Sequence, residues 1–343
     1  IRIGILCPSE IAFRRFMPAL LKMEQFEYVG LAVATEEEWF GKIMENGQKP
    51  VISEYTKAEN FQNTYGGNIY IGYKALITSQ DIDAIYIPLP PALHYKWGKL
   101  ALENGKNVLL EKPFTTSSRE TKELISIAIE KKLAVHENYM FVYHTQLNYI
   151  KDTLNIGMIG NIRLFRIDFG FPFRGTNDFR YNKELGGGAL LDCGGYTLKL
   201  ATYFLGETTR LVTSQKNYNA DFNVDMYGSA TLVNDEGLTA QVSFGMDNSY
   251  KCSLEVWGST GTLFTNRILT APDGFEPVVI MKTQEGEQTV SLPADDTFYK
   301  SIKHFGECIF DEETRKETYK VICKQAELVE RYVEKDESNR VRN

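Results

Sequence analysis

The chain has 343 residues, of which 43% are hydrophobic and 24% are charged, and its formal net charge is −7 at pH 7. This length suits about two domains of ordinary size, and the composition is typical of a globular protein that can bury a large core. The negative charge, without any run of lysine and arginine, argues against a nucleic-acid partner, and no apolar run approaches the roughly 18–20 residues of a membrane span.

The cysteines and histidines are scattered along the chain. There are five cysteines and four histidines, and no two cysteines form a Cys-x-x-Cys pair. This usage argues against a zinc site or a disulfide framework and is typical of a reducing cytoplasm. The first residues, IRIGIL, predict a strand and not a signal peptide, so we expect a cytoplasmic protein without a metal.

Short apolar segments alternate with helical patterns in the first part of the chain. Strands are expected at residues 1–6, 28–34, 84–88, 107–110 and 133–138. Ser9 is the expected N-cap of the first helix, and a later helix is expected over residues 118–132. Short apolar strands separated by helices predict βαβ units and a parallel sheet, which binds ligands beyond the carboxyl ends of its strands.

Residues 40–68 make a longer connection than these units need. Turn signals occur at Asn46-Gly47 and Lys49-Pro50, and a short helix is expected near residues 56–64. We interpret the segment as an insertion at the rim of the sheet.

After about residue 145 the pattern changes to long alternating strands. Hairpin signals and period-two alternation predict strands within residues 161–171, 225–246, 252–266 and 277–283. A glycine-rich helical segment is expected at 186–206, and two helices at 295–310 and 314–334 precede a polar tail that we expect to fray. Alternation buries one face of a sheet, so this part predicts an α+β domain with an open antiparallel sheet.

The first strand-to-helix turn is a candidate phosphate-binding turn. The pattern G-x-G-x-x-G/A would place its three small residues at Cys7, Ser9 and Ala12, and only Ala12 is standard. Pro8 has no N–H to offer a phosphate, although the helix N-terminus still does. The signal is weak, and a helix that simply starts after a turn explains it equally well.

The end of the second strand bears on the choice of cofactor. Thr35, Glu36 and Glu37 follow it, with no arginine to bind a 2′-phosphate. An acid here typically binds a ribose hydroxyl, which favours NAD slightly over NADP. The alternative is that these acids occupy the first turn of a helix, where the helix dipole favours negative charge.

Two segments carry candidate reactive groups. Lys112 follows the buried strand at 107–110, where a solvated strand exit would be the ordinary explanation. A helix that starts at Ala189 would place Asp192 and Tyr196 on one face. Gly194 and Gly195 inside this helix cost about 1 kcal/mol each relative to alanine, so something must pack closely there. A flat cofactor ring and a helix–sheet contact are both candidates.

A lysine, a tyrosine and an aspartate around one point suit hydride transfer at a carbon that bears oxygen. Lys112 would donate a hydrogen bond to the oxygen on which negative charge grows, and the phenol of Tyr196 would deliver the proton. The nearby ammonium would lower the pKa of the phenol, and Asp192 would orient the pair. Because none of these groups performs redox chemistry, a nicotinamide is required.

Four segments together resemble the Gfo/Idh/MocA oxidoreductase family over nearly the full length. They are IGILCPSEIAFRRFMPAL, SQDIDAIYIPLPPALHYKWGKLALENGKNVLLEKPF, ELGGGALLDCGGYTLKLATYFLG and LEVWGSTGTL. The resemblance implies a Rossmann dinucleotide-binding domain at 1–140, with the insertion at about 40–68, and a substrate and oligomerisation domain at 141–343. It also implies NAD or NADP as cofactor and a sugar or nucleotide-linked sugar as substrate.

The resemblance assigns the reactive groups. Lys112, Asp192 and Tyr196 match the catalytic positions of the family, and the Lys112–Pro113 bond is expected to be cis. A tyrosine in this motif is similar to that of the glucose–fructose oxidoreductases, dihydrodiol dehydrogenases and sugar 3-ketoreductases. The segment IAFRRFMPA is also similar to the 3-ketoreductases that act on nucleotide-linked sugars.

The resemblance further implies which residues meet the ligands. The candidate cofactor-binding residues are Cys7, Ser9, Glu10, Ile11, Thr35, Pro88, Leu89, Pro90, His94, Glu111 and Lys112. The candidate substrate residues are Arg174, Asn177 and Arg180, in the segment that leads into the catalytic helix. A structural role is more common for a lone histidine such as His94, and a solvated loop explains the three substrate candidates equally well.

The departures from the family pattern lie at the cofactor end, where Cys7 and Ser9 replace glycines, and Pro90-Pro91 replaces the usual Pro-Asn. Three functions therefore remain open: an NAD(P)-dependent sugar dehydrogenase or reductase, a catalytically weakened sugar- or nucleotide-binding protein, and a NAD-cycling sugar hydrolase or epimerase. The first is favoured because the reactive residues are intact. The open sheet face predicts a homodimer or homotetramer.

Overall fold

The computed structural model describes residues 1–40, 48–219 and 221–340 and divides the chain into two compact units. Unit 1 comprises Ile1–Asn138 and Phe298–Cys323, and unit 2 comprises Tyr139–Thr297 and the chain from Lys324 on. The first border lies two residues from the predicted one. Residues 298–323 group with unit 1, whereas the sequence analysis placed them in the second domain.

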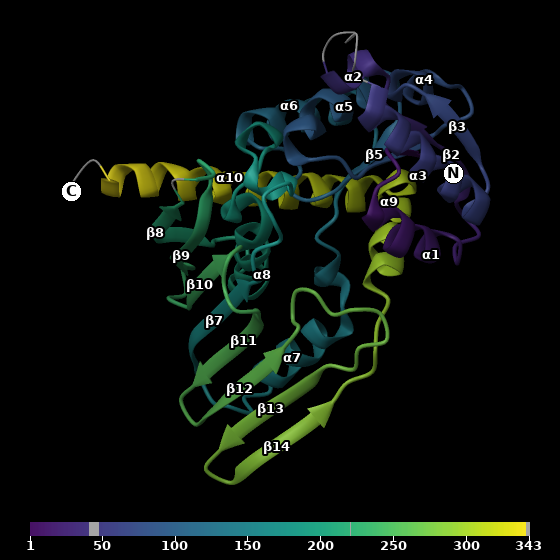
Figure 1. Ribbon diagram of the computed structural model, residues 1–343. Helices are drawn as coiled ribbons and strands as arrows, with labels where there is room; N and C mark the ends of the chain where they lie inside the picture. The colour runs from purple at the N-terminus through teal and green to yellow at the C-terminus, as the bar shows by residue number, and fades with distance from the viewer. Residues whose placement is uncertain (41–47, 220, 341–343) are drawn as a thin grey trace. The chain divides into compact units, whose positions relative to one another are not determined.

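Unit 1 contains the predicted parallel sheet, which has six strands in the order β3-β2-β1-β4-β5-β6. Figure 1 labels β2, β3 and β5 of this sheet. Its strands are β1 (Arg2–Leu6), β2 (Glu27–Val33), β3 (Asn68–Ile71), β4 (Ala84–Ile87), β5 (Asn107–Leu110) and β6 (Val135–Glu137). β1 and β4 are central and almost entirely buried, because both faces of the sheet are covered. β3 was not predicted, and two of its four residues are exposed.

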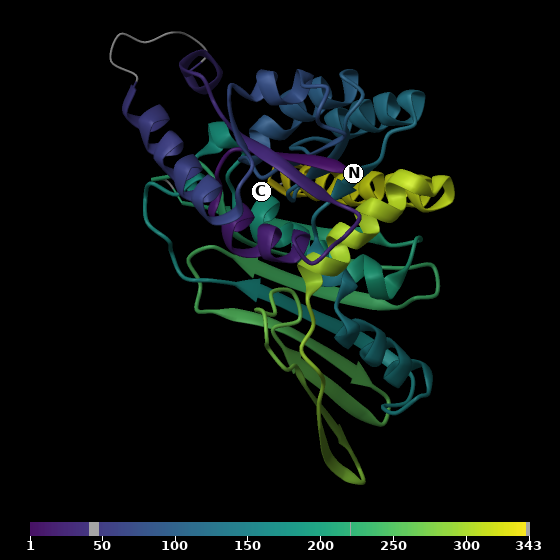
Figure 2. The same cartoon turned by 90° about the vertical axis from the view of Figure 1, so that its right-hand side faces the viewer.

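Helices cover the sheet of unit 1. They are the π-helical turn η1 (Ala12–Phe16), α1 (Met17–Leu20), α2 (Glu36–Phe40), α3 (Gln48–Tyr65), α4 (Tyr73–Thr78), α5 (Pro91–Glu103), α6 (Ser118–Lys131) and α9 (Thr297–Phe310). α5 and α6 contact each other and lie side by side in Figure 2. The helix expected at 56–64 belongs to the longer α3, and the expected turn at Asn46-Gly47 lies outside the described residues.

The reason why α9 belongs to unit 1 is visible in its buried face. The ring of Phe305 stacks on Phe26 with centroids 6.3 Å apart, and the hydroxyl of Ser301 donates to Oδ1 of Asn138 at 2.8 Å. An amphipathic pattern shows that a helix has a buried face, but it does not say which core covers that face.

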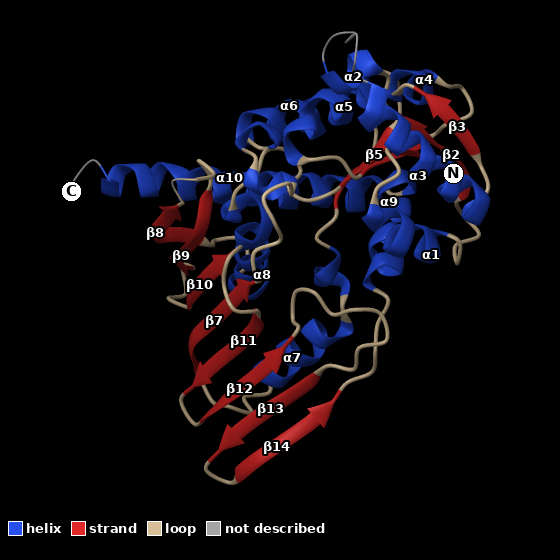
Figure 3. Ribbon diagram, viewed as in Figure 1, coloured by secondary structure: helices blue, strands red, loops and turns tan. Residues whose placement is uncertain are grey.

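Unit 2 contains an eight-stranded sheet in the order β14-β13-β12-β11-β7-β10-β9-β8, and Figure 3 shows these strands in red. The strands are β7 (Ile162–Gly170), β8 (Arg210–Tyr218), β9 (Asp225–Val233), β10 (Thr239–Gly245), β11 (Lys251–Gly258), β12 (Gly261–Asn266), β13 (Val278–Thr283) and β14 (Gly286–Ser291). Only the pairing of β7 with β10 is parallel among the described pairs, so the predicted mostly antiparallel sheet is confirmed.

One face of this sheet is covered and the other is open, as the alternation predicted. Phe165, Ile167 and Phe169 of β7 are buried, and α8 (Gly195–Leu205) packs against β7 and β10. Between them, Arg166 is exposed and Asp168 is half-buried on the opposite face. The other helical segments of unit 2 are η2 (Met140–Tyr143), α7 (Thr145–Asn155), η3 (Phe179–Tyr181), η4 (Lys183–Leu185) and η5 (Leu190–Gly194).

The last helix, α10 (Glu312–Arg340), runs from unit 1 into unit 2. It extends six residues beyond the end expected at 334, through part of the tail that we expected to fray. Within the described ranges, no helix is long and apolar enough to cross a membrane.

Candidate active site

The cofactor end of unit 1 begins at the turn after β1. Cys7 adopts φ 69°, in the left-handed region, and its N–H donates to the carbonyl of Ala32 at 3.0 Å. This is the conformation that a glycine adopts without strain, so the tight turn forms although the glycine is missing. Burial raises the pKa of the Cys7 thiol to about 12, which keeps the thiol neutral.

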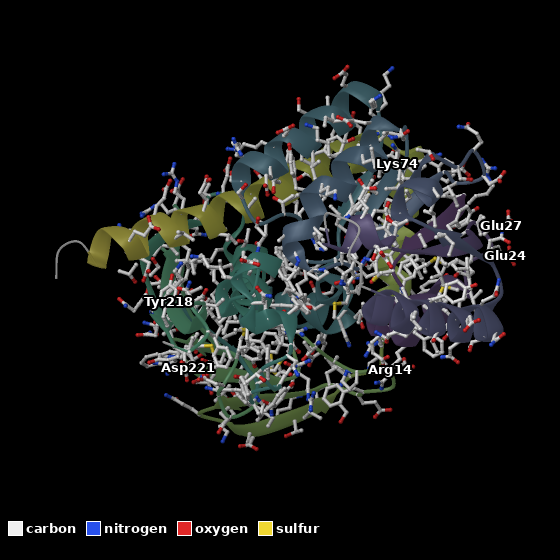
Figure 4. The ribbon with its side chains drawn as sticks, turned by 45° about the horizontal axis from the view of Figure 1, so that its top comes forward. Arg14, Glu24, Glu27, Lys74, Tyr218 and Asp221 are labelled. Atoms are coloured by element: carbon white, nitrogen blue, oxygen red, sulfur yellow. The ribbon has the colours of Figure 1, made fainter. Side chains whose placement is uncertain are left out.

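Ser9 caps the helical segment that follows this turn, as predicted. Its Oγ accepts a hydrogen bond from the N–H of Ala12 at 3.2 Å. Ile11 is half-buried, whereas Glu10 is exposed and pairs with Arg14 at 3.3 Å on the surface, where Arg14 is labelled in Figure 4. The side chain of Glu10 is therefore engaged on the surface, and a ligand at this turn would contact only its backbone.

The acids after β2 belong to the first turn of α2. The carboxylate of Glu38 accepts from the N–H of Thr35 at 3.0 Å, and the hydroxyl of Thr35 accepts from the N–H of Glu38 at 3.2 Å. This reciprocal pair is a capping box. Glu38 also accepts from the N–H groups of Tyr73 at 2.8 Å and Lys74 at 3.0 Å. The acids after β2 therefore lie in the first turn of α2, as the helix-dipole alternative expected, and Glu38 also caps that turn.

The segment after β4 contains Pro88, Leu89 and Pro90 and leads into α5. His94 is fully buried, and its Nε2 and Nδ1 lie 2.7 Å from the carbonyl of Leu89 and 2.8 Å from that of Pro113. A neutral imidazole donates to one of them at a time, and burial lowers the pKa of the ring. His94 thus ties α5 to the Glu-Lys-Pro turn, which is the structural role weighed above.

The Glu-Lys-Pro turn follows β5 directly, and the Lys112–Pro113 bond is cis, as the resemblance implied. Oε1 of Glu111 accepts from the hydroxyl of Tyr86 at 2.7 Å and from Nδ2 of Asn138 at 2.6 Å. Burial raises the pKa of the Glu111 carboxyl against the opposing effect of these two donors and of the Lys112 ammonium. The carboxylate is therefore part of a network that fixes the ends of β4, β5 and β6 around Lys112.

In unit 2, the helix that carries Asp192 and Tyr196 is built in two parts. The π-helical turn η5 precedes α8, whereas a single α-helix from Ala189 was expected. A carboxylate oxygen of Asp225 on β9 accepts from the N–H of Leu190 at 2.7 Å and so anchors the start of this helix. π-helical turns inside helices are frequent at functional sites.

The two glycines of the helix are explained by contacts within unit 2. A Cβ on Gly194 would lie about 3.0 Å from the ring of Phe244, and a Cβ on Gly195 would lie 2.1 Å from the hydroxyl oxygen of Tyr139. A cofactor ring and a helix–sheet contact were both candidates for what packs against these glycines. Close packing of the helix against the protein accounts for both of them.

Tyr196 stands in a set of aromatic rings. Its ring centroid lies 5.1 Å from that of Tyr139, 5.7 Å from Phe141 and 5.3 Å from Phe169, and the side chain is largely buried. Lys199, one turn further along, is also buried, and its Nζ lies 5.5 Å from the centroid of Tyr139. This lysine was missed, although its spacing of three from Tyr196 placed it on the same side of the helix.

Asp192 pairs with a candidate substrate residue. Its Oδ2 lies 2.8 Å from Nε of Arg180, and Nη1 of Arg180 lies 3.0 Å from Oδ1 of Asp178. Burial opposes the charged form of the guanidinium, but the two carboxylates outweigh it and raise the pKa of Arg180. Arg180 therefore ties the segment before the helix to the helix itself.

The other substrate candidates lie on that segment. Arg174 is exposed and its guanidinium lies 4.6 Å from the ring centroid of Phe171, whereas Asn177 is exposed to solvent. Unit 2 thus brings Arg180 to Asp192, and Tyr196 lies four residues after Asp192 along the same helical segment. Unit 1 places its candidate cofactor residues at the carboxyl ends of β1, β2, β4 and β5.

A dinucleotide fits the residues that unit 1 presents. The tight turn after β1 has the required left-handed residue, and the strand order places the turns after β1 and β4 next to each other. Among the described residues, no three His, Cys, Asp or Glu side chains are grouped to hold a metal ion.

Comparison with known proteins identifies the family. Residues 46–139 match the oxidoreductase family with an NAD-binding Rossmann fold, and residues 147–264 match the GFO/IDH/MocA C-terminal domain. The chain is similar to the dTDP-3,4-didehydro-2,6-dideoxy-alpha-D-glucose 3-reductase of Actinomadura kijaniata, with 37% identity over 96% of this chain and 94% of that one. The enzyme of the same name from Saccharopolyspora spinosa is 34% identical over 89% and 86%.

A solved structure is similar over the whole length. The crystal structure of a 3-ketoreductase from Actinomadura kijaniata, in complex with NADP and TDP-benzene, gives a TM-score of 0.88 at 36% identity and covers 98% of this chain and 97% of that one. One family model matches residues of unit 1 and the other matches residues of unit 2. The chain belongs to the Gfo/Idh/MocA family of oxidoreductases.

Proposed function

We propose that this chain is an NADPH-dependent reductase of a keto group on a nucleotide-linked sugar. The similarity to 3-ketoreductases of dTDP-linked sugars over nearly the full length carries this proposal. Mutants of the relative from Actinomadura kijaniata carry a lysine-to-alanine or a tyrosine-to-phenylalanine substitution, and the two substituted positions are 84 residues apart. Lys112 and Tyr196 have the same separation here (196 − 112 = 84).

The reactive groups would act on the carbonyl of the substrate. The nicotinamide, when bound, supplies the hydride for the carbonyl carbon. Lys112 donates a hydrogen bond to the carbonyl oxygen as negative charge grows there, and the phenol of Tyr196 transfers its proton to that oxygen. The carbonyl becomes an alcohol, and Tyr196 regains its proton from solvent. Asp192 is held by Arg180 one turn before Tyr196 and would orient the reactive pair.

NADP is favoured over the NAD that the acids after β2 suggested. The solved relative was crystallised with NADP. Glu36 and Glu37, on which the preference for NAD rested, lie in the first turn of α2, where the helix dipole alone favours acids. The backbones of Cys7, Ser9, Glu10 and Ile11 would meet the pyrophosphate, and Thr35 the adenosine ribose. Pro88, Leu89, Pro90, Glu111 and Lys112 would flank the nicotinamide side.

We also propose that the chain forms a homodimer or homotetramer through the open face of the unit 2 sheet. Trp257 and Tyr227 are 55% and 47% exposed there, and Val278 is 38% exposed. These exposed apolar side chains lie on three different strands, β9, β11 and β13, of the open face, and a second copy of the chain could bury them. Light scattering on the purified protein tests this, and a monomeric mass would rule it out.

The function is tested by titrating the protein with NADPH and NADH in a calorimeter and then adding a dTDP-linked 3-ketosugar. We expect tighter binding of NADPH and loss of its absorbance on addition of the sugar. Binding of the sugar without oxidation of NADPH would favour the weakened binding protein. Nicotinamide that stays bound through turnover, with no net redox change, would favour the NAD-cycling hydrolase or epimerase.

A further inference from the structure

Three aromatic side chains of unit 2 form a cluster that the proposed chemistry does not use. The ring centroids of Phe173 and Tyr181 lie 4.6 Å apart, those of Phe173 and Phe222 lie 5.6 Å apart, and those of Tyr181 and Phe222 lie 5.2 Å apart. Tyr181 is buried, Phe222 is half-buried and Phe173 is 44% exposed. We call these three residues the aromatic platform.

Hydrogen bonds hold the base of the platform. The hydroxyl of Tyr181 donates to the carbonyl of Met246 at 3.0 Å and accepts from the N–H of Arg174 at 3.1 Å. Phe222 lies in the connection between β8 and β9. Tyr218, the last residue of β8, and Asp221, which precedes Phe222, are labelled in Figure 4. Tyr181 is therefore fixed by hydrogen bonds at its hydroxyl, whereas the ring of Phe173 keeps a part of its surface in water.

The platform is connected to the catalytic helix. Tyr181 directly follows Arg180, whose guanidinium binds Asp192 at 2.8 Å. Asp192 lies one turn before Tyr196. Arg174 is exposed next to Phe173, and its guanidinium lies over Phe171 with 4.6 Å to the ring centroid. An aromatic surface and an exposed cation thus occur together on a segment that is tied to the reactive helix.

This pairing matches the chemistry of a nucleoside diphosphate. Bases of every kind stack on aromatic rings because each has a π-face, and arginine is suited to phosphate oxygens through its forked donors. In a nucleotide-linked sugar, the diphosphate separates the base from the reacting sugar carbon, so the base needs a binding surface of its own. The apolar surface of Phe173 would lose its contact with water when a base covers it.

We propose that the aromatic platform stacks the nucleobase of the nucleotide-linked substrate and that Arg174 binds its diphosphate. This inference rests on the proposed function, because it names the subsite that would hold the nucleotide part of that substrate. The stacking of one base on one ring is expected to change affinity by roughly 10- to 100-fold.

The test measures the affinity of the full chain for thymidine diphosphate by calorimetry, without cofactor. We expect Phe173→Ala to weaken binding roughly 10- to 100-fold and Phe173→Tyr, which keeps an aromatic ring, to retain it. Phe310→Ala is the matched control, since Phe310 is 77% exposed on α9 of unit 1. Arg174→Gln is expected to weaken the binding of thymidine diphosphate but to leave the affinity for thymidine, which has no phosphate, unchanged.

A second variant separates stacking from folding. Phe173→Leu keeps an apolar side chain without a π-face, and we expect it to lose most of the affinity while it binds NADPH like the wild type. Equal affinity of the wild type, Phe173→Ala and Phe173→Leu for thymidine diphosphate would overturn the inference and leave the proposed function intact. No binding of thymidine diphosphate by the wild type would overturn the nucleotide-linked substrate itself, and with it this inference.

Discussion

The turn after β1 in unit 1 and the turn before η5 in unit 2 solve the same geometric problem with different residues. Each needs a residue with positive φ, and each continues into a π-helical turn before a regular α-helix begins. Cys7 takes this role in unit 1 at φ 69°, and Gly188 takes it in unit 2 at φ 124°. A non-glycine residue in the left-handed region costs roughly 1–2 kcal/mol.

The two turns differ in how much room they leave for a side chain. The turn in unit 2 leaves none and keeps its glycine, whereas the turn in unit 1 leaves room and has a cysteine in place of the glycine. A Cβ on Gly188 would lie 2.5 Å from Oδ1 of Asp225, the residue that anchors the start of the helix carrying Tyr196. Cys7 has room for its side chain, and its Sγ contacts the carbonyl oxygen of Pro88 at 3.7 Å. A missing glycine in the sequence is therefore compatible with an intact turn.

The largest effect is expected from the reactive groups. Tyr196→Phe and Lys112→Met should each lower kcat by about 10²- to 10⁴-fold, because each removes a group that donates to the developing alkoxide. Stopped-flow measurement of NADPH oxidation gives the rates, and calorimetry should give unchanged NADPH affinity for Tyr196→Phe. A kcat within threefold (about 0.6 kcal/mol) of the wild type in either variant would refute its assigned role.

The next effect concerns the glycines of the catalytic helix. Gly195→Ala should destabilise the protein by about 1–3 kcal/mol, because the new Cβ would displace Tyr139, which is 1% exposed and packs on Tyr196. Urea denaturation measures the free energy of unfolding. Gly98→Ala in α5 is the control, since its Cβ would meet only the ends of Leu124 at 3.3 Å and Leu110 at 3.6 Å, and we expect it to be neutral or stabilising.

A smaller effect is expected at Cys7. The Cys7→Gly variant should be more stable than Cys7→Ala by about 1 kcal/mol, since alanine keeps the left-handed strain and glycine removes it. At a helical position such as Ala128, replacement by glycine should instead destabilise. If the glycine variant were less stable than the alanine variant at position 7, as it is expected to be at position 128, the strained conformation of Cys7 would be contradicted.

The smallest effect depends on pH. The pKa of Glu111 is raised above its ordinary value of 4.5, so the folded protein holds this proton at pH values where the unfolded chain has lost it. The stabilisation is complete below the unfolded pKa and is lost as pH rises through the folded pKa. Glu111→Gln removes this dependence.

Denaturation of both proteins at several pH values measures this effect. The stability of Glu111→Gln relative to the wild type should rise with pH once the pH exceeds the ordinary carboxyl pKa of 4.5. The amide oxygen introduced by Glu111→Gln can still accept from Tyr86 and Asn138. The loss of hydrogen bonds therefore contributes little to the stability difference between the variant and the wild type. A difference that stays constant with pH would show that the carboxyl is not perturbed.

The sequence by itself determined the architecture of both units. Short, almost wholly apolar strands such as β1 and β4 are typical of a covered parallel sheet, and the alternation of β7 requires one open face. Edge strands were harder to predict: β14 is almost entirely exposed, and β8 has a polar pattern, so neither carries a strong apolar signal. Four sequence segments taken together, including those around Lys112 and Tyr196, pointed to the family.

Only the tertiary structure decided how the side chains are used. It placed α9 in unit 1, gave the carboxylate of Glu38 to backbone donors, and joined Arg180 to Asp192. It also explained Gly194 and Gly195 by Phe244 and Tyr139, which lie far from them in the sequence. The physical reason is that periodicity reports burial along one element, whereas a side chain's partner depends on which other element the fold brings against it.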